Sequence, residues 1–208
     1  MSNNKCNVVV LGVTGGIACG KSEVGRFLGE LGFDVCDADL VAHGLMKKGT
    51  PLYQQLVNFF GNHILSDDDE ISRPILGGII FDNPMQREAL NRFVHPVVRE
   101  ALEGWITERH RQGCSGAVLV PLLFESGMDT LDLDAVLCVS CPEELVFRRL
   151  EKRGLNRVDA ERRIDAQMPL EDKERRADFT VPNAGTLQEL KEETRKAVEE
   201  VYRLKGRL

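Results

Sequence analysis

Short apolar runs and helical patterns alternate along the chain. Residues 8–13 (VVVLGV) are a nearly continuous, mostly β-branched run, which predicts a strand covered on both faces. Apolar side chains then recur at helical spacing, at Val24, Phe27, Leu28 and Leu31, before Gly32. Residues 33–36 predict a second short strand. A strand, a helix and a strand in this order predict parallel pairing through a right-handed crossover.

The middle of the chain has a different pattern. Residues 40–112 are mostly helical, with breaks at GTP (49–51), DDDE (67–70) and DNP (82–84). Pro96 interrupts the last helical pattern, so we expect it to kink that helix or divide it in two. The region predicts a helical insertion into an α/β core.

Strands and helices alternate again after the insertion. Apolar runs at 117–125, 134–140 and 178–183 predict three further strands, the first continuing into its exit loop. Helices are expected from Pro142 onward and over 186–204. This alternation favours an α/β fold built on a parallel sheet.

Length and charge narrow the functional classes. With 208 residues, of which 42% are hydrophobic, the chain suits one globular domain with an inserted subdomain. Its net charge of −6 provides no general field for nucleic acid or anionic lipid, so we expect neither as a partner. No apolar stretch approaches the ~20 residues of a membrane span, and the N-terminus has no signal-peptide layout.

A glycine-rich motif lies directly between the first strand and its helix. Gly15, Gly20, Lys21 and Ser22 match the pattern G-x-x-x-x-G-K-[ST] at every fixed position. Glycines let several backbone N–H groups point inward at a phosphate, and the helix start adds its positive dipole end. Lys21 is expected to reach the β- and γ-phosphates of ATP, and the Ser22 hydroxyl to bind Mg²⁺. The motif predicts the three-layer P-loop NTPase fold.

The expected nucleotide site covers the whole loop and the first helical turn. Its residues are Gly15, Gly16, Ile17, Ala18, Cys19, Gly20, Lys21, Ser22 and Glu23. The chain contains no Asn-Lys-x-Asp sequence, which disfavours a GTPase. The strand at 117–120 does not end in an acidic residue, so an acid from 37–39 or Glu125 is expected to support the metal.

Two aspartates follow the second strand. In an extended segment residues two apart face the same way, so we expect Asp37 and Asp39 to point into the crevice beyond the strand ends. An aspartate there can accept the proton of an attacking hydroxyl. The alternative is a pair of loop aspartates, with Asp39 capping the helix that follows.

Arginines are dense between residues 148 and 176. A closing lid could use them to neutralise the transferred phosphoryl group, whereas most of them are better explained as a solvated surface paired with nearby acids. Arg157 differs because it lies in GLNR, an expected turn between two helices. A side chain at such a tip could extend to the phosphates when a lid closes.

The cysteines suggest a location and a reactive group. Six cysteines without a secretion signal are typical of reduced thiols in the cytoplasm. Cys138 and Cys141 form one CxxC, better explained as small apolar side chains at a strand end than as a metal site. Cys19 lies beside Lys21 and a helix start, a setting that lowers the pKa of a thiol, and the alternative is an inert loop side chain.

Together these motifs resemble the dephospho-CoA kinases over almost the whole chain. The matching stretches are TGGIACGKS (14–22), DADLVAH (37–43), SRPILGGIIF (72–81), HPVV (95–98), PLLFE (121–125), RIDAQ (163–167) and ADFTVPNAG (177–185). The first is shared widely among P-loop proteins, and the others are more specific in this order and spacing.

The resemblance implies an ATP-dependent kinase that phosphorylates the 3′-hydroxyl of dephospho-CoA with Mg²⁺. It implies Asp39 as the base, Asp37 as its neighbour in the site, Lys21 on the phosphates and Arg157 as the lid arginine. It also implies a nucleotide-binding core, a helical substrate domain and a lid, with the bounds 1–39, 113–147 and 177–208 for the core, 40–112 for the helical domain and 148–176 for the lid.

Four positions depart from the family pattern or lack a clear role. Ala18 and Cys19 stand where glycine and serine are more usual, and His43 stands where an arginine is usual. Neutral histidine cannot replace a guanidinium fork on a phosphate. For His95, packing or capping within a helix is at least as good an interpretation as catalysis.

Two other functions fit parts of the pattern. One is another small-molecule P-loop kinase, acting on a nucleoside monophosphate or a sugar, which the loop and the arginines do not exclude. The other is a non-catalytic nucleotide switch, which would not need Asp37 and Asp39.

Overall fold

The computed structural model describes residues 8–81 and 83–206. The chain divides into two compact units: residues 1–37 with 105–208, and residues 38–104. Helix α5 (Pro84–Gln112) begins in the second unit and ends in the first. The predicted division into a nucleotide-binding core, a substrate domain and a lid assigns a ligand to each part of the chain, and it stays a prediction.

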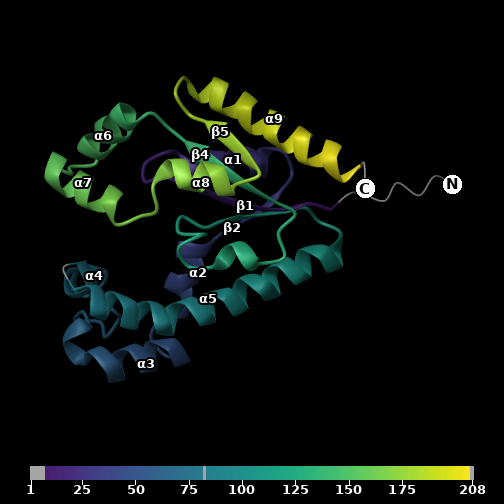
Figure 1. The fold of residues 1–208 in the computed structure, drawn as a ribbon. Helices are drawn as coiled ribbons and strands as arrows, with labels where there is room; N and C mark the ends of the chain where they lie inside the picture. The colour runs from purple at the N-terminus through teal and green to yellow at the C-terminus, as the bar shows by residue number, and fades with distance from the viewer. Residues whose placement is uncertain (1–7, 82, 207–208) are drawn as a thin grey trace. The chain divides into compact units, whose positions relative to one another are not determined.

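A five-stranded parallel sheet organises the first unit (Figure 1). Its strands are β1 (Val10–Gly15), β2 (Asp34–Asp37), β3 (Gly116–Leu119), β4 (Ala135–Ser140) and β5 (Phe179–Pro182). They lie in the order β2-β3-β1-β4-β5, and every neighbouring pair is parallel. All carboxyl ends therefore meet at one edge, beside the glycine-rich loop. The structure confirms the five predicted strands and the α/β fold class.

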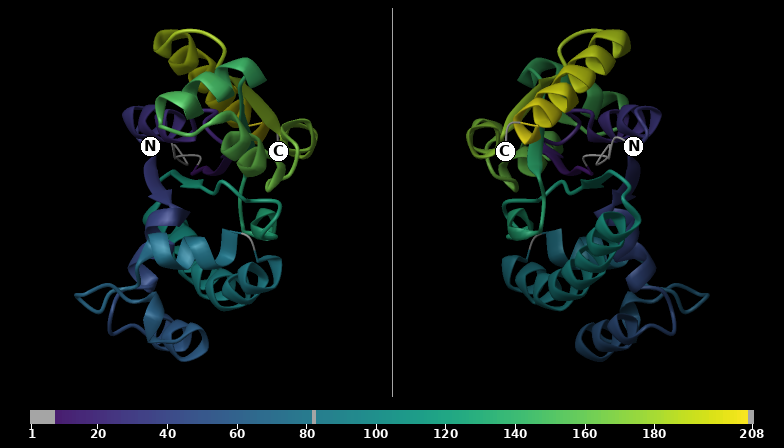
Figure 2. Two further views of the ribbon diagram at one scale, coloured as in Figure 1. Left: turned by 90° about the vertical axis from the view of Figure 1, so that its left-hand side faces the viewer. Right: turned by 90° about the vertical axis from the view of Figure 1, so that its right-hand side faces the viewer.

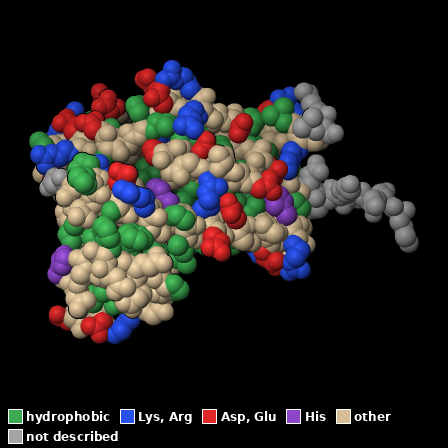
Figure 3. Space-filling view, turned by 60° about the horizontal axis from the view of Figure 1, so that its bottom comes forward, with side chains coloured by type: hydrophobic (Ala, Val, Ile, Leu, Met, Phe, Trp, Pro, Cys, Tyr) green, Lys and Arg blue, Asp and Glu red, His purple; other side chains and the backbone are tan. Residues whose placement is uncertain are grey.

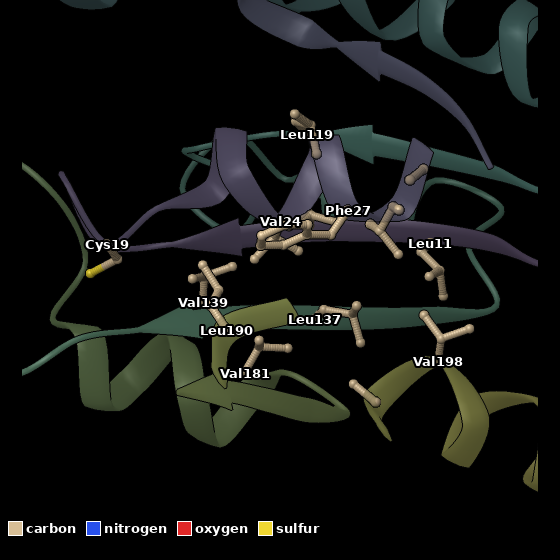
Figure 4. Packing of buried hydrophobic residues seen from close by; sticks show 14 of the residues in the cluster. Leu11, Cys19, Val24, Phe27, Leu119, Leu137, Val139, Val181, Leu190 and Val198 are labelled. Carbon is tan, nitrogen blue, oxygen red and sulfur yellow. The ribbon is translucent and has the colours of Figure 1, made fainter. Parts of the chain in front are cut away.

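One face of the sheet is covered by α1 (Lys21–Glu30) and α9 (Leu187–Lys205), as Figures 1 and 2 show. Alternate strand residues point into this layer, as period-2 geometry requires. The buried cluster includes Leu11, Val24, Phe27, Leu137, Val139, Leu190 and Val198 (Figure 4). Gly32, with φ 89°, follows the end of α1, where the sequence places a helix stop.

The intervening residues face a second layer. A Cβ built on Gly12 would lie 2.7 Å from the Leu133 side chain, and one on Gly116 would lie 2.8 Å from the Trp105 ring. The exit loop of β3 and the end of α5 therefore pack closely on this face. Helix α8 (Leu170–Arg176) lies against β1 and β4 here, which completes the three layers.

Two further helices of the first unit follow β4. They are α6 (Glu143–Lys152) and α7 (Arg157–Asp165), and a short 3₁₀ turn, η2 (Met128–Thr130), precedes β4. Asn156 caps α7, since its side chain accepts a hydrogen bond from Asp159 N. The turn predicted from GLNR therefore lies between α6 and α7, and Arg157, its last residue, is the first residue of α7.

The second unit is helical. It contains α2 (Ala38–Leu45), α3 (Pro51–Phe60), η1 (Asn62–Ile64), α4 (Arg73–Phe81) and the first part of α5. Its own buried cluster is formed by Leu52, Leu56, Phe60, Ile64 and Leu76. Helix α5 is continuous through Pro96, so of the two alternatives, a kink or a division of the helix, the division is wrong.

Charged side chains of both signs are intermingled on the face that Figure 3 presents. Many pair within one helix, as Arg26 does with Glu23 and Arg99 with Glu103. Across the described part of the chain, no helix combines the length and apolarity that crossing a bilayer requires.

Candidate active site

The two fixed glycines of the loop motif, Gly15 and Gly20, each lie where a side chain would clash with a different neighbour. Gly15 has φ 143° and Gly20 has φ 104°, both in the region that L side chains rarely adopt. A Cβ on Gly15 would lie 2.2 Å from Val139 O, and one on Gly20 would lie 2.3 Å from Asn183 Nδ2. The loop backbone therefore runs tightly between β4 and the residue after β5.

Lys21 and Ser22 open helix α1. The Lys21 Nζ donates hydrogen bonds to Gly15 O (2.9 Å) and Gly16 O (2.8 Å), so the ammonium lies across the loop. Ser22 is exposed, and Glu23 pairs with Arg26 Nε at 3.0 Å. Among the described residues, no side chain caps this helix, whose N-cap is Gly20. The first N–H groups of an uncapped helix have no partner within the helix, which suits an anionic phosphate.

Two side chains from distant segments hold the loop backbone. Arg149 of α6 donates from Nη1 to Ala18 O (3.0 Å) and from Nη2 to Asn183 O (3.4 Å). Asn183 is buried and donates from Nδ2 to Cys19 O (2.7 Å). Ala18 has φ 55°, a left-handed conformation that costs an L residue roughly 1–2 kcal/mol. These bonds fix that conformation at the centre of the loop.

Arg149 and Asn183 were not among the residues predicted for the site. A signal for Asn183 was present, because it directly follows β5 at the edge where all carboxyl strand ends meet. Arg149 is one of several neighbouring arginines, and the signal that distinguishes it is its position on α6 beside the apolar Val146 and Leu150.

Cys19 is not an activated thiol. Its side chain is 1% exposed, and burial raises its pKa to about 11, although Lys21 and Arg149 act in the opposite direction. It lies at the end of the core cluster in Figure 4. The prediction of a lowered pKa is wrong because desolvation outweighs the nearby positive charges.

The two cysteines of the CxxC, Cys138 and Cys141, are also buried. Cys138 belongs to β4, and burial raises its pKa to about 12; burial also raises the pKa of Cys141. Both are free thiols within the core of the first unit. In residues 8–81 and 83–206, no three His, Cys, Asp or Glu side chains are grouped to hold a metal.

Asp37 and Asp39 differ in local structure. Asp37 is the last residue of β2 and is half-buried, whereas Asp39 is exposed in the first turn of α2. Helix α2 begins at Ala38, so the prediction of an extended segment over 37–39 is wrong. Asp37 belongs to the first unit and Asp39 to the second.

Arg157 is the first residue of α7. Its Nε donates to Glu161 Oε1 (2.9 Å), its guanidinium lies 3.8 Å from the centre of the Phe147 ring, and its side chain is 66% exposed. A groove of about 650 Å³ between α6 and α7 is lined by Arg157 and Phe147 together with Glu144 and Leu155. The role of Arg157 on the phosphates remains a prediction.

Glu125, the other acid considered for a metal, is bound by a lysine. The Lys173 Nζ lies 2.8 Å from Glu125 Oε1 and donates to Pro121 O (2.9 Å). Lys173 is completely buried, whereas the Glu125 side chain is 21% exposed.

Comparison with known proteins places this geometry in one family. A family model described as CoaE, dephospho-CoA kinase, matches residues 9–189. A dephospho-CoA kinase of Bacillus cereus is 42% identical over 185 residues, covering 88% of this chain and 92% of the relative.

Two solved structures are similar along nearly their whole length. TT1252 from Thermus thermophilus has a TM-score of 0.77 at 33% identity, covering 93% of this chain and 97% of that one. The dephospho-CoA kinase from Campylobacter jejuni has a TM-score of 0.69 at 29% identity, covering 96% and 98%. The model match and the curated relative show that the chain belongs to the dephospho-CoA kinase family.

Proposed function

We propose that this protein transfers the γ-phosphoryl group of ATP to the 3′-hydroxyl of dephospho-CoA, giving coenzyme A and ADP. The observation that carries the proposal is a constrained phosphate loop in a chain whose family match covers residues 9–189. The five described cysteines are free thiols, which supports the cytoplasm as the proposed location.

In the proposed mechanism, amides of residues 15–22 bind the phosphate chain and Lys21 neutralises it. The Lys21 ammonium now contacts Gly15 O and Gly16 O, so nucleotide would exchange these carbonyls for phosphate oxygens. The exposed Ser22 hydroxyl in the first turn of α1 fits a Mg²⁺ ligand. When bound, Mg²⁺ supplies charge neutralisation at the phosphates.

We further propose that Asp39 accepts the proton of the ribose hydroxyl, with Asp37 beside it. Its support is the position of the two aspartates, Asp37 as the last residue of β2 and Asp39 in the first turn of α2, next to the edge of the sheet where parallel strands end. Residues 40–112 would hold dephospho-CoA, and residues 148–176, with Arg157, would close over the phosphates.

Substitution of Asp39 by asparagine tests the base. We expect Asp39→Asn to lower kcat by about 10²–10⁴-fold, since a general base contributes this much, while ATP still binds. The measurement is steady-state turnover with dephospho-CoA, beside ATP titration of the same protein, and Asp37→Asn is the matched variant. A kcat near wild type in Asp39→Asn would remove Asp39 from this role.

The identity of the phosphoryl acceptor is tested with the wild-type protein. We expect turnover with dephospho-CoA to exceed turnover with AMP, dCMP and gluconate. A better rate with any of the other three would replace the proposed substrate by that compound's class. No transfer to any acceptor, with ATP bound, would favour the nucleotide switch instead.

A further inference from the structure

Lys173 is a buried charge that the proposed mechanism does not use. It is 0% exposed on α8, and lysine is almost never fully buried unless it is paired. Its Nζ contacts Glu125 Oε1 (2.8 Å) and Pro121 O (2.9 Å). Glu125 Oε1 also accepts a hydrogen bond from Met168 N (3.0 Å). The pair of Lys173 and Glu125 therefore joins α8, the segment before it and the exit of β3.

The same network reaches the phosphate loop. Pro121 O also accepts a hydrogen bond from Thr14 Oγ1 (3.2 Å). Thr14 is completely buried in β1 and directly precedes Gly15. Pro121 O is thus shared between the residue before the loop and the lysine of α8.

One face of α8 is docked by three residues at spacing i, i+3 and i+6. Leu170 packs at the loop, since a Cβ on Gly16 would lie 3.6 Å from its Cδ1. Lys173 follows one turn later, and Arg176 pairs with Asp129 at 2.8 Å between Nη2 and Oδ2. The helix that ends the arginine-rich segment is therefore fixed against both the loop and the exit of β3.

Stability alone does not explain a charged pair at this place. Apolar side chains of similar volume often stabilise a core as well as a buried ion pair does. A charged pair with directed hydrogen bonds instead specifies one arrangement of its partners. In this case the partners are the entry of the phosphate loop and the last helix of the segment 148–176.

We propose that Lys173 and Glu125 are positioning residues for phosphoryl transfer. Through Pro121 and Thr14 they hold the phosphate loop and α8 in fixed positions relative to each other. The proposal rests on the proposed kinase function. Lys173 acts without touching the nucleotide, and its effect falls on kcat because transfer tolerates misalignment less than binding does.

The test is the double variant Lys173→Met/Glu125→Gln. It removes both charges together, and the introduced amide oxygen still accepts a hydrogen bond from Met168 N. We expect a melting temperature close to wild type, ATP affinity within threefold and a kcat at least tenfold lower. A kcat equal to wild type at an unchanged melting temperature would show a purely structural pair and overturn the proposal.

Thr14→Val and Thr14→Ser form a second test, which also decides the matter if the double variant does not fold. The valine variant loses the hydroxyl that reaches Pro121 O, and the serine variant keeps it. We expect kcat to fall severalfold with valine and to recover with serine, at similar ATP affinity. Equal kcat values in the two variants would overturn the link between Pro121 and the loop.

A third measurement does not depend on the acceptor. Limited trypsin digestion reports local opening at Arg175 and Arg176. We expect cleavage there to be at least fivefold faster in the double variant than in wild type; equal rates would overturn the docking of α8. If the wild-type protein failed to phosphorylate dephospho-CoA, only the proposed function would be refuted, because the digestion tests the pair of Lys173 and Glu125 independently.

Discussion

At the scale of single residues, burial decides the chemistry of the phosphate loop more than nearby charge does. Cys19 has Lys21 and Arg149 close by, and both favour a thiolate, yet its pKa is raised to about 11 because the side chain is 1% exposed. The loop thus carries a cationic group beside a thiol that stays protonated at neutral pH.

We therefore expect Cys19 to resist alkylation. At pH 7.5 N-ethylmaleimide should modify Cys19 at least about 100-fold more slowly than the exposed Cys114, because only a small fraction of the Cys19 thiol is ionised. Peptide mapping by mass spectrometry over time measures both rates in one sample. Modification of Cys19 as fast as that of Cys114 would contradict the burial described above.

At the scale of elements, the phase of α6 selects one arginine from a pair. Val146 and Leu150 are buried against the core, and Arg149 lies beside them on the helix surface. Arg149 therefore faces the loop, whereas Arg148 is exposed. Neighbouring arginines on one helix have different environments for this reason.

Replacing each of these arginines by alanine separates their roles. We expect Arg149→Ala to destabilise the protein by about 1.5–3 kcal/mol and to raise the KM for ATP, because Ala18 O and Asn183 O lose a charged donor. Arg148→Ala should stay within about 0.5 kcal/mol of wild type. Urea unfolding and ATP titration measure the two effects. Similar losses in both variants would contradict the assigned contact.

The phosphate loop and the strands are predictable from sequence because their signals are local. Fixed spacing identifies Gly15 and Gly20, and a continuous apolar run identifies β1. The extended geometry assumed after β2 is wrong because α2 begins at Ala38, and the apolar pattern alone does not locate the first residue of a helix. The contacts of Arg149 and Lys173 are not predictable in this way, since they join segments distant in the sequence.

At the scale of the whole molecule, the pH dependence of stability depends on groups that folding desolvates. His95 is half-buried in α5, and burial lowers its pKa below the usual 6.5. The unfolded chain therefore binds a proton at this residue at a higher pH than the folded protein does. The contribution of His95 to stability is full above about pH 6.5 and is lost as the pH decreases through and below that value.

Melting temperatures across this range test the assignment. We expect the melting temperature to fall between pH 7.5 and pH 5.5, and His95→Gln to reduce that fall. His63→Gln, at an exposed position, is the matched control and should leave the slope unchanged. Thermal unfolding followed by circular dichroism measures each slope. Identical slopes for wild type and His95→Gln would show that other groups dominate.

The shape of the glycine-rich loop depends on residues far away in the sequence. Ala18 keeps its left-handed backbone beside a donor 131 positions away in the sequence, and Cys19 O is held by an amide 164 positions away. A peptide spanning residues 12–28, or the same stretch grafted onto a foreign scaffold, would retain the motif and lose its shape. The loop conformation that suits an anion therefore needs Arg149 and Asn183, which both lie in the C-terminal third of the chain.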